Sequence, residues 1–207
     1  MMCHSVMARS IDPYRRDAIL DAAHSVFARK GYAAAGIADL AREVGIGHGT
    51  VYRYFENKRA VAEALFDRAM ARVAEVIAAE SPDGTDDLAA YRAQVQRIGH
   101  RLFELFTEDP ALARLLFQEL GTVDPQLRER LAHALDLFAG YTAAYLNNGV
   151  AKGFLRADLD VEITARLINS MIFEAAANIS DAADPKPLRD RLVHAVTTLM
   201  FDGVTAR

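Results

Sequence analysis

Apolar side chains recur at every third or fourth position along almost the whole chain of 207 residues, and strict alternation of apolar and polar residues is nearly absent. Such spacing puts the apolar residues on one face of an α-helix, whereas a half-buried strand requires alternation. Hydrophobic residues make up 52% of the chain, which is enough for a substantial core. The pattern therefore predicts an all-α protein of about nine helices.

Clusters of glycine, proline and aspartate mark the ends of these periodic segments. Pro13 and Pro125 suit the first turn of a helix, and Asp124, directly before Pro125, is predicted to cap its helix through its side chain. The run from Ser81 to Gly84 is the clearest loop. The helices are predicted at 13–31, 37–44, 48–54, 57–81, 88–107, 110–121, 124–149, 160–180 and 186–203.

Cysteine content and hydropathy indicate where such a chain works. Cys3 is the only cysteine, so no disulfide can form within the chain. A reducing compartment is therefore expected. No apolar run approaches the roughly 20 residues that a membrane span needs, and the first ten residues lack the apolar core of a secretory signal. We therefore expect a cytoplasmic protein without membrane contact.

The charge of the chain is unevenly distributed. Residues 1–60 carry nine Lys and Arg against six Asp and Glu, a net charge of +3, which leaves −7 on the rest of a chain whose net charge is −4. A basic module on an acidic body suits phosphate contact by the first part alone, because bound cations release counterions from nucleic acid.

One stretch, 36–55, predicts two short helices that cross closely. Ile37, Leu40 and Val44 form the buried side of the first helix, and Ala41 is small enough for the second helix to approach. Gly45 is expected to take the left-handed conformation that ends a helix. With Val51 directed inward, the second helix can enter a DNA major groove. The residues expected to contact DNA are Gly47, His48, Gly49, Thr50, Tyr52, Arg53, Tyr54 and Lys58.

At this point the sequence resembles the TetR (tetracycline-repressor-like) family of bacterial regulators. The resemblance spans about Arg15 to Leu65 and rests on these matching segments: Ile19-Leu20-Asp21-Ala22-Ala23, Phe27-Ala28-Arg29-Lys30-Gly31-Tyr32, Ile37-Ala38-Asp39-Leu40-Ala41, Val44-Gly45, Gly49-Thr50-Val51-Tyr52-Arg53-Tyr54-Phe55 and Asn57-Lys58. It implies a disordered N-terminal arm (1–12), a helix-turn-helix DNA-binding domain (13–58) and a ligand-binding and dimerisation domain (59–207). It also implies a homodimeric transcriptional repressor that a small, largely apolar ligand releases from a palindromic operator in double-stranded DNA.

Two departures from the family's pattern bear on DNA contact. Ala35-Gly36 stands where the family usually has Thr or Ser, which removes a helix cap and a phosphate contact. Gly47-His48 stands where the family usually has Ser followed by Lys or another small residue. Gly at a cap costs only a few tenths of a kcal/mol relative to Ser. His48 leaves the helix entrance less charged, so weaker non-specific DNA binding is expected.

The second half of the chain resembles the family only in length, helicity and the phrase Gly153-Phe154-Leu155-Arg156. A helical bundle can house an apolar cavity with a few polar groups. The side chains expected to line it are His100, Phe103, Phe117, Tyr141, Tyr145 and Phe173. The resemblance further implies a dimer interface of four helices, two from each subunit. The residues expected in it are Ile168, Met171, Ile172, Ala175, Leu188, Leu192, Ala195, Val196 and Leu199.

Two other classes of function remain as alternatives. An enzyme needs a constellation of catalytic groups, and none assembles: Asp21 and His24 form half of a di-iron pattern, and Cys3-His4 is half of a zinc site. No enzyme activity, cofactor or metal is therefore expected. The other alternative is a helical small-molecule-binding protein without sequence-specific DNA binding. Salt-dependent DNA affinity separates that protein from a regulator.

Overall fold

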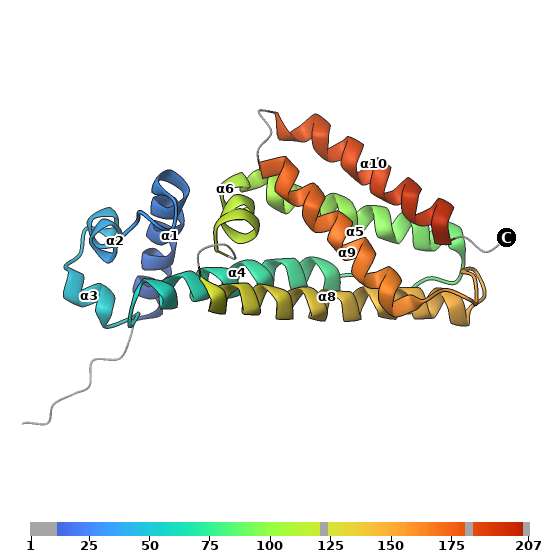
Figure 1. Cartoon of the computed structure of the whole chain (residues 1–207), viewed down its shortest axis with the longest axis horizontal. Helices are drawn as coiled ribbons and strands as arrows, with labels where there is room; N and C mark the ends of the chain where they lie inside the picture. Colours follow the sequence, from blue (N-terminus) through green and yellow to red (C-terminus); the bar gives the residue numbers. More distant parts are fainter. Residues whose placement is uncertain (1–11, 121–123, 181–183, 205–207) are drawn as a thin grey trace, which may run out of the picture. The chain divides into compact units, whose positions relative to one another are not determined.

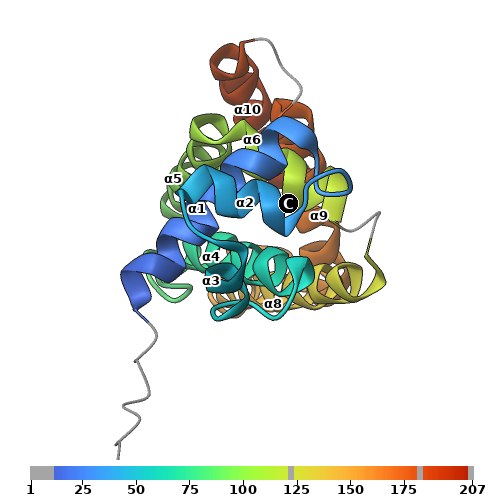
Figure 2. The ribbon, with the colours of Figure 1, turned by 90° about the vertical axis from the view of Figure 1, so that its left-hand side faces the viewer.

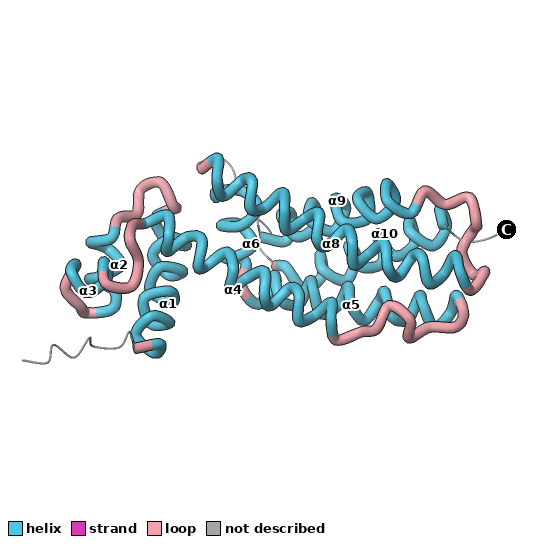
Figure 3. The backbone as a smooth tube through the Cα atoms, turned by 90° about the horizontal axis from the view of Figure 1, so that it is seen from below, coloured by secondary structure: helices cyan, strands magenta, loops and turns pink. Residues whose placement is uncertain are grey.

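The computed structural model describes residues 12–120, 124–180 and 184–204. Within these ranges the chain is helical and contains no strand, as Figure 3 shows by its colours. The prediction of an all-α fold is confirmed. Of the predicted N-terminal arm, only Asp12 lies among the described residues, where its carboxylate accepts from the Tyr14 backbone N–H at 3.0 Å and caps the first helix.

The chain divides into two compact units, with the boundary between Leu65 and Phe66. The sequence placed this boundary at 58/59. Both positions fall within one helix, α4 (Lys58–Ala78), so the connection between the two units is helical rather than a loop.

The N-terminal unit contains α1 (Pro13–Lys30), α2 (Ile37–Val44), α3 (His48–Tyr52) and the first turns of α4, all labelled in Figure 2. Its core is formed by fully buried apolar side chains from all four helices: Ile19, Leu20, Phe27, Leu40, Val51 and Val61. The Phe27 and Tyr32 rings pack edge to face at 5.4 Å, which closes this core where α1 ends.

The C-terminal unit is a helical bundle. In it α5 packs against α10, α8 packs against α9, and α9 packs against α10 (Figure 1). Besides the rest of α4, its elements are α5 (Leu88–Glu108), α6 (Pro110–Arg114), the π-helix η1 (Leu115–Leu120), α8 (Pro125–Ala151), α9 (Val161–Ser180) and α10 (Pro185–Val204).

Most helix starts follow the predicted capping rules. Asp124 accepts from the backbone N–H of Gln126 at 3.0 Å and Pro125 begins α8, as predicted. The helix after Pro110 differs, because it passes into a π-helix at Leu115 instead of continuing as a regular α-helix. The successive side chains of Leu115 and Leu116 are both buried there. The pattern of apolar spacing carries no signal for such a widened turn.

The far end of the bundle is closed by a tight contact at Gly149. A Cβ atom at this position would lie 2.5 Å from Cδ1 of Leu155, a side chain that is itself buried. The backbone of α8 therefore approaches the following loop more closely than any larger residue allows. The neighbouring core contains Tyr91, Tyr145 and Leu146.

Candidate nucleic-acid interface and ligand cavity

The turn between α2 and α3 has the geometry that its sequence predicts. Gly45 has φ +74° and ψ +35°, in the left-handed region, and ends α2. The Ile46 N–H donates to the Ala41 carbonyl at 2.9 Å, which fixes the change of direction. Ala41 and Val51 are buried, so the two helices meet through small and β-branched side chains.

The start of α2 lacks a side-chain cap at Gly36, as the departure at Ala35-Gly36 predicts, but the backbone N–H of Gly36 is bound from within the helix. The Asp39 carboxylate accepts from the Gly36 backbone N–H at 3.1 Å and also pairs with Lys30 at 2.6 Å. These contacts hold the pKa of Asp39 below its usual value, the hydrogen bond from Lys30 having the largest effect. One half of a capping box is therefore present, while the helical N–H groups from which a Thr or Ser side chain would accept have no side-chain partner at residue 36.

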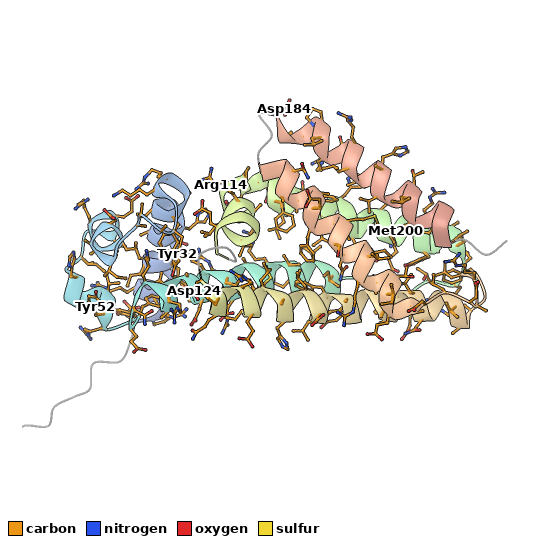
Figure 4. The ribbon with its side chains drawn as sticks, in the orientation of Figure 1. Tyr32, Tyr52, Arg114, Asp124, Asp184 and Met200 are labelled. Carbon is orange, nitrogen blue, oxygen red and sulfur yellow. The ribbon has the colours of Figure 1, made fainter. Side chains whose placement is uncertain are left out.

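The second motif helix presents most of its predicted contact residues to solvent. His48, Gly49 and Arg53 are exposed, and the Tyr52 side chain is 54% exposed at the end of α3 (Figure 4). Thr50 and Tyr54 are half-buried. A Cβ atom at Gly47 or Gly49 would meet no described atom within 4 Å, so the packing of this unit does not require glycine at either position.

Lys58 has a different environment from the exposed cation that the sequence suggested. Its ammonium donates to the backbone carbonyls of Tyr32 at 2.8 Å, Ala33 at 3.1 Å and Ala35 at 2.8 Å, and lies 4.6 Å from the centre of the Tyr32 ring. Partial burial lowers its pKa from the ordinary lysine value. These bonds use all three N–H groups, so a phosphate contact by this ammonium would have to displace a carbonyl.

Replacing Lys58 with methionine is therefore expected to destabilise the N-terminal unit by about 2 kcal/mol, because three carbonyls lose a charged donor. Thermal unfolding followed by circular dichroism measures this effect. Lys186, an exposed lysine on α10, provides the control K186M, which should leave the melting curve unchanged. A purely DNA-contacting Lys58 would instead leave stability unaltered and weaken only DNA binding.

Several other charges of the N-terminal unit are paired or stacked. Arg29 makes two hydrogen bonds to the Glu43 carboxylate, at 3.1 and 2.7 Å, and this pairing lowers the pKa of Glu43. The Arg16 guanidinium lies over the Phe55 ring. Arg53, beside α3, is exposed and makes no ion pair with a described residue. It is therefore well suited to meet a phosphate or a guanine edge.

The C-terminal unit contains a partly open apolar cavity of about 80 Å³ between α5, α8, α9 and α10, with Ile77 of α4 in its wall. None of the described side chains that line it is charged. Its polar groups come from Thr142, Tyr145, Asn169 and Thr197, together with the hydroxyl of Tyr91, and Met200, labelled in Figure 4, lies in the α10 wall.

Phe103 and Tyr145, two of the side chains expected in the cavity, line it. His100 and Tyr141 are exposed instead. Each is the direct neighbour in sequence of a lining residue, Gly99 or Thr142. A shift of one position turns a side chain by about 100° around a helix, which is enough to direct it away from the cavity. Phe173 packs on Phe138 with the ring centres 6.2 Å apart. The side chain of Phe117 lies outside the described part of the structure. The apolar residues that sequence reasoning missed, such as Val95 and Ile98, look like ordinary core positions in the sequence.

Tyr145 connects the cavity to the end of α4. Its hydroxyl lies 2.7 Å from the Glu80 carbonyl and 3.1 Å from the Ile77 carbonyl, and can donate to either. The same segment is fixed from α5, where Arg97 makes two hydrogen bonds to the Glu80 carboxylate. A side chain that touches the cavity contents thus also holds the last turn of α4.

A second hollow is an open apolar groove of about 750 Å³ along α9 and α10. Seven of the nine side chains predicted for the dimer interface line it: Ile168, Met171, Ala175, Leu192, Ala195, Val196 and Leu199. Ile172 lies in the wall of the cavity instead, and Leu188 is half-buried outside both hollows. Leu167, which the sequence did not single out, lines the groove and is 60% exposed, as is Leu199.

The N-terminal unit has a helix-turn-helix with an exposed second helix, and α4 connects it to an all-helical unit with an apolar cavity. These features are typical of a DNA-binding regulator that responds to a ligand. The family model for bacterial regulatory proteins of the tetR family matches residues 19–65, and a tetracyclin repressor-like C-terminal domain matches residues 89–177. The chain belongs to the TetR family and is a DNA-binding transcriptional regulator.

Individual relatives agree with this assignment. The chain is 30% identical to the transcriptional regulator TtgR of Pseudomonas putida over 159 residues, 72% of each chain. The solved structure of the fatty acid degradation regulator FadR from Bacillus halodurans has a TM-score of 0.79 at 26% identity, covering 96% of this chain and 100% of that one. FadR from Bacillus subtilis, solved with stearoyl-CoA, shares the fold with a TM-score of 0.72 at 23% identity, covering 88% and 97%. These relatives are transcriptional regulators, not enzymes.

The described residues contain neither a membrane-spanning helix nor a cluster of metal ligands. No helix among them is both long and apolar enough to cross a membrane. Nor does this part of the chain bring together three His, Cys, Asp or Glu side chains that could hold a metal ion. Residues 1–11, which include Cys3 and His4, lie outside the described part of the chain.

Proposed function

We propose that the chain acts as a homodimeric repressor whose two α3 helices enter successive major grooves of a palindromic operator, and that a small apolar ligand in the C-terminal cavity releases it. The observation that carries the ligand response is the Tyr145 link between the cavity and the end of α4. Because α4 begins at Lys58 in the N-terminal unit, a change at its end can reach the DNA-binding residues.

The size of the cavity supports a response of this kind. A closed apolar cavity of about 150 Å³ holds one benzene molecule, and the space here is about 80 Å³. We therefore expect a ligand larger than benzene to move the cavity walls apart, which include Tyr145 and Ile77. FadR of Bacillus subtilis, with the same fold, was solved with a ligand that carries a long acyl chain, which is consistent with a cavity that opens around apolar chains.

The open groove along α9 and α10 supports the dimer. Two leucines at 60% exposure on neighbouring helices are costly on a monomer surface, and a second copy of the same groove would cover them. The two-fold axis of such a dimer would match a palindromic site.

The proposal is tested by fluorescence anisotropy with DNA from the region upstream of the gene. Binding should weaken steeply with salt, because phosphate contacts release counterions. A panel of small uncharged apolar compounds should contain at least one that raises the dissociation constant about tenfold. Salt-insensitive binding, or affinity that no compound changes, would contradict the proposal.

Tyr145→Phe is expected to uncouple ligand binding from DNA release. The variant still lines the cavity but cannot donate to the Glu80 carbonyl, so a compound that shifts wild-type operator affinity about tenfold should shift the variant less than about threefold. Tyr141→Phe, on the same helix but half-exposed, is the matched control and should respond like the wild type. Equal responses of Y145F and wild type would show that the signal takes another route.

A further inference from the structure

Asn169 is the most unusual polar side chain in the cavity wall. It lies on α9 between Ile168 and Ser170, is 7% exposed, and lines the cavity. Its Oδ1 accepts from the Thr142 hydroxyl at 2.9 Å. Its Nδ2 is fully buried and has no acceptor among the described residues. An amide nitrogen carries two N–H donors, and buried donors in folded proteins are nearly always satisfied.

The rest of the wall restricts what can supply the missing acceptor. None of the described lining residues is charged, so a carboxylate, phosphate or ammonium group would lose its water without gaining an ionic partner. A neutral carbonyl oxygen accepts from an amide N–H at much lower desolvation cost. The chemistry of the wall therefore favours an uncharged acceptor over an anion.

The shape of the cavity restricts the rest of the molecule. Its lining residues on α5 extend from Tyr91 to Phe103, which corresponds to about 18 Å at the rise of an α-helix. We interpret a volume of about 80 Å³, bordered along such a length of α5, as a narrow slot. A slot of this kind is opened with least displacement by a thin, chain-like molecule.

We propose that the ligand is an uncharged, elongated apolar molecule with one carbonyl group, such as a ketone, ester or lactone, whose oxygen accepts from Nδ2 of Asn169. This inference rests on the proposed ligand response and names the class of ligand. Asn169 is the specificity-determining residue, and Thr142 orients it.

A matched set of nine-carbon probes tests the proposal by direct binding to the full chain without DNA. The probes are 2-nonanone, nonane, nonanoate and nonanoyl-CoA, with headspace partitioning for the two volatile compounds and calorimetry for the two charged ones. Asn169→Leu, which is close in size but cannot donate, is expected to weaken 2-nonanone binding about tenfold and to leave nonane binding unchanged or tighter. Asn147→Leu, at an exposed asparagine on α8, is the control and should change neither.

A second measurement needs no variant. The carbonyl stretch of 2-nonanone bound to the wild type should move to lower frequency than in hexane, because the oxygen accepts a hydrogen bond. Nonanoate and nonanoyl-CoA should bind the wild type at least tenfold more weakly than the ketone.

The inference is overturned by the absence of ketone binding, by a carbonyl stretch equal to that in hexane, or by charged probes that bind as tightly as the ketone. Equal ketone affinity of wild type and N169L would also overturn it. These outcomes are separate from the ligand response itself. If the ketone binds as expected but operator affinity does not change, the proposed release mechanism fails while the ligand class stands.

Discussion

Replacing Tyr52 and Arg53 together with alanine is expected to lower operator affinity by at least about a hundredfold, because each lost contact costs about 1–3 kcal/mol and occurs twice in a dimer. Both side chains are exposed beside the buried Val51, so their removal leaves the packing of the N-terminal unit intact. Fluorescence anisotropy with operator DNA measures the loss, and the salt dependence should become shallower because Arg53 is a cation.

A matched control lies in the same unit. Tyr14 and Arg15 are an exposed Tyr-Arg pair at the start of α1, so their double alanine variant removes the same charge and ring area away from α3. We expect it to change operator affinity far less. If the two double variants weaken binding equally, the contact is general electrostatic attraction and α3 is not the recognition helix.

Leu199→Glu is expected to weaken dimerisation by at least about a hundredfold. Burying a leucine contributes about 1.5–3 kcal/mol, and a two-fold interface contains the residue twice. Operator affinity should fall with it, since a monomer reaches only one half-site. Analytical ultracentrifugation and anisotropy measure the two effects separately.

Leu137→Glu is the control for this prediction. Leu137 is 57% exposed on α8 and does not line the groove, so the same change in charge should leave the dimer intact. If the L199E variant remains dimeric and the L137E variant is monomeric, the dimer interface lies on α8 instead.

The contrast between predictable and unpredictable features follows from how far apart the interacting residues lie in the sequence. Gly45 ends α2 for a reason contained in its own backbone, and Asp124 caps α8 through residues two and three positions ahead. Such local physics is readable from a single sequence. The set of side chains that line the cavity cannot be predicted from the sequence in this way, because it depends on the exact rotation of each helix about its axis.

Lys58 and Asn169 are examples of features that the sequence does not predict. Lys58 binds carbonyls 23 to 26 residues earlier in the chain, and the partner of Asn169 lies 27 residues away on another helix. From the sequence alone, Lys58 looks like an exposed cation, and Asn169 looks like a polar interruption of an apolar helix. Asn169 nevertheless carries a weak signal, since a lone amide in an apolar run is costly unless it has a partner.

The ion pairs between α1 and α2 also affect how the regulator finds its site. Arg29 and Lys30 are neutralised by Glu43 and Asp39, so the outward field of the N-terminal unit is weaker than its count of basic residues suggests. Long-range attraction to DNA accelerates association and supports sliding along non-specific sequence. We therefore expect slow, weakly guided encounters with the chromosome, in which residence at the correct site depends on short-range fit rather than on electrostatic capture.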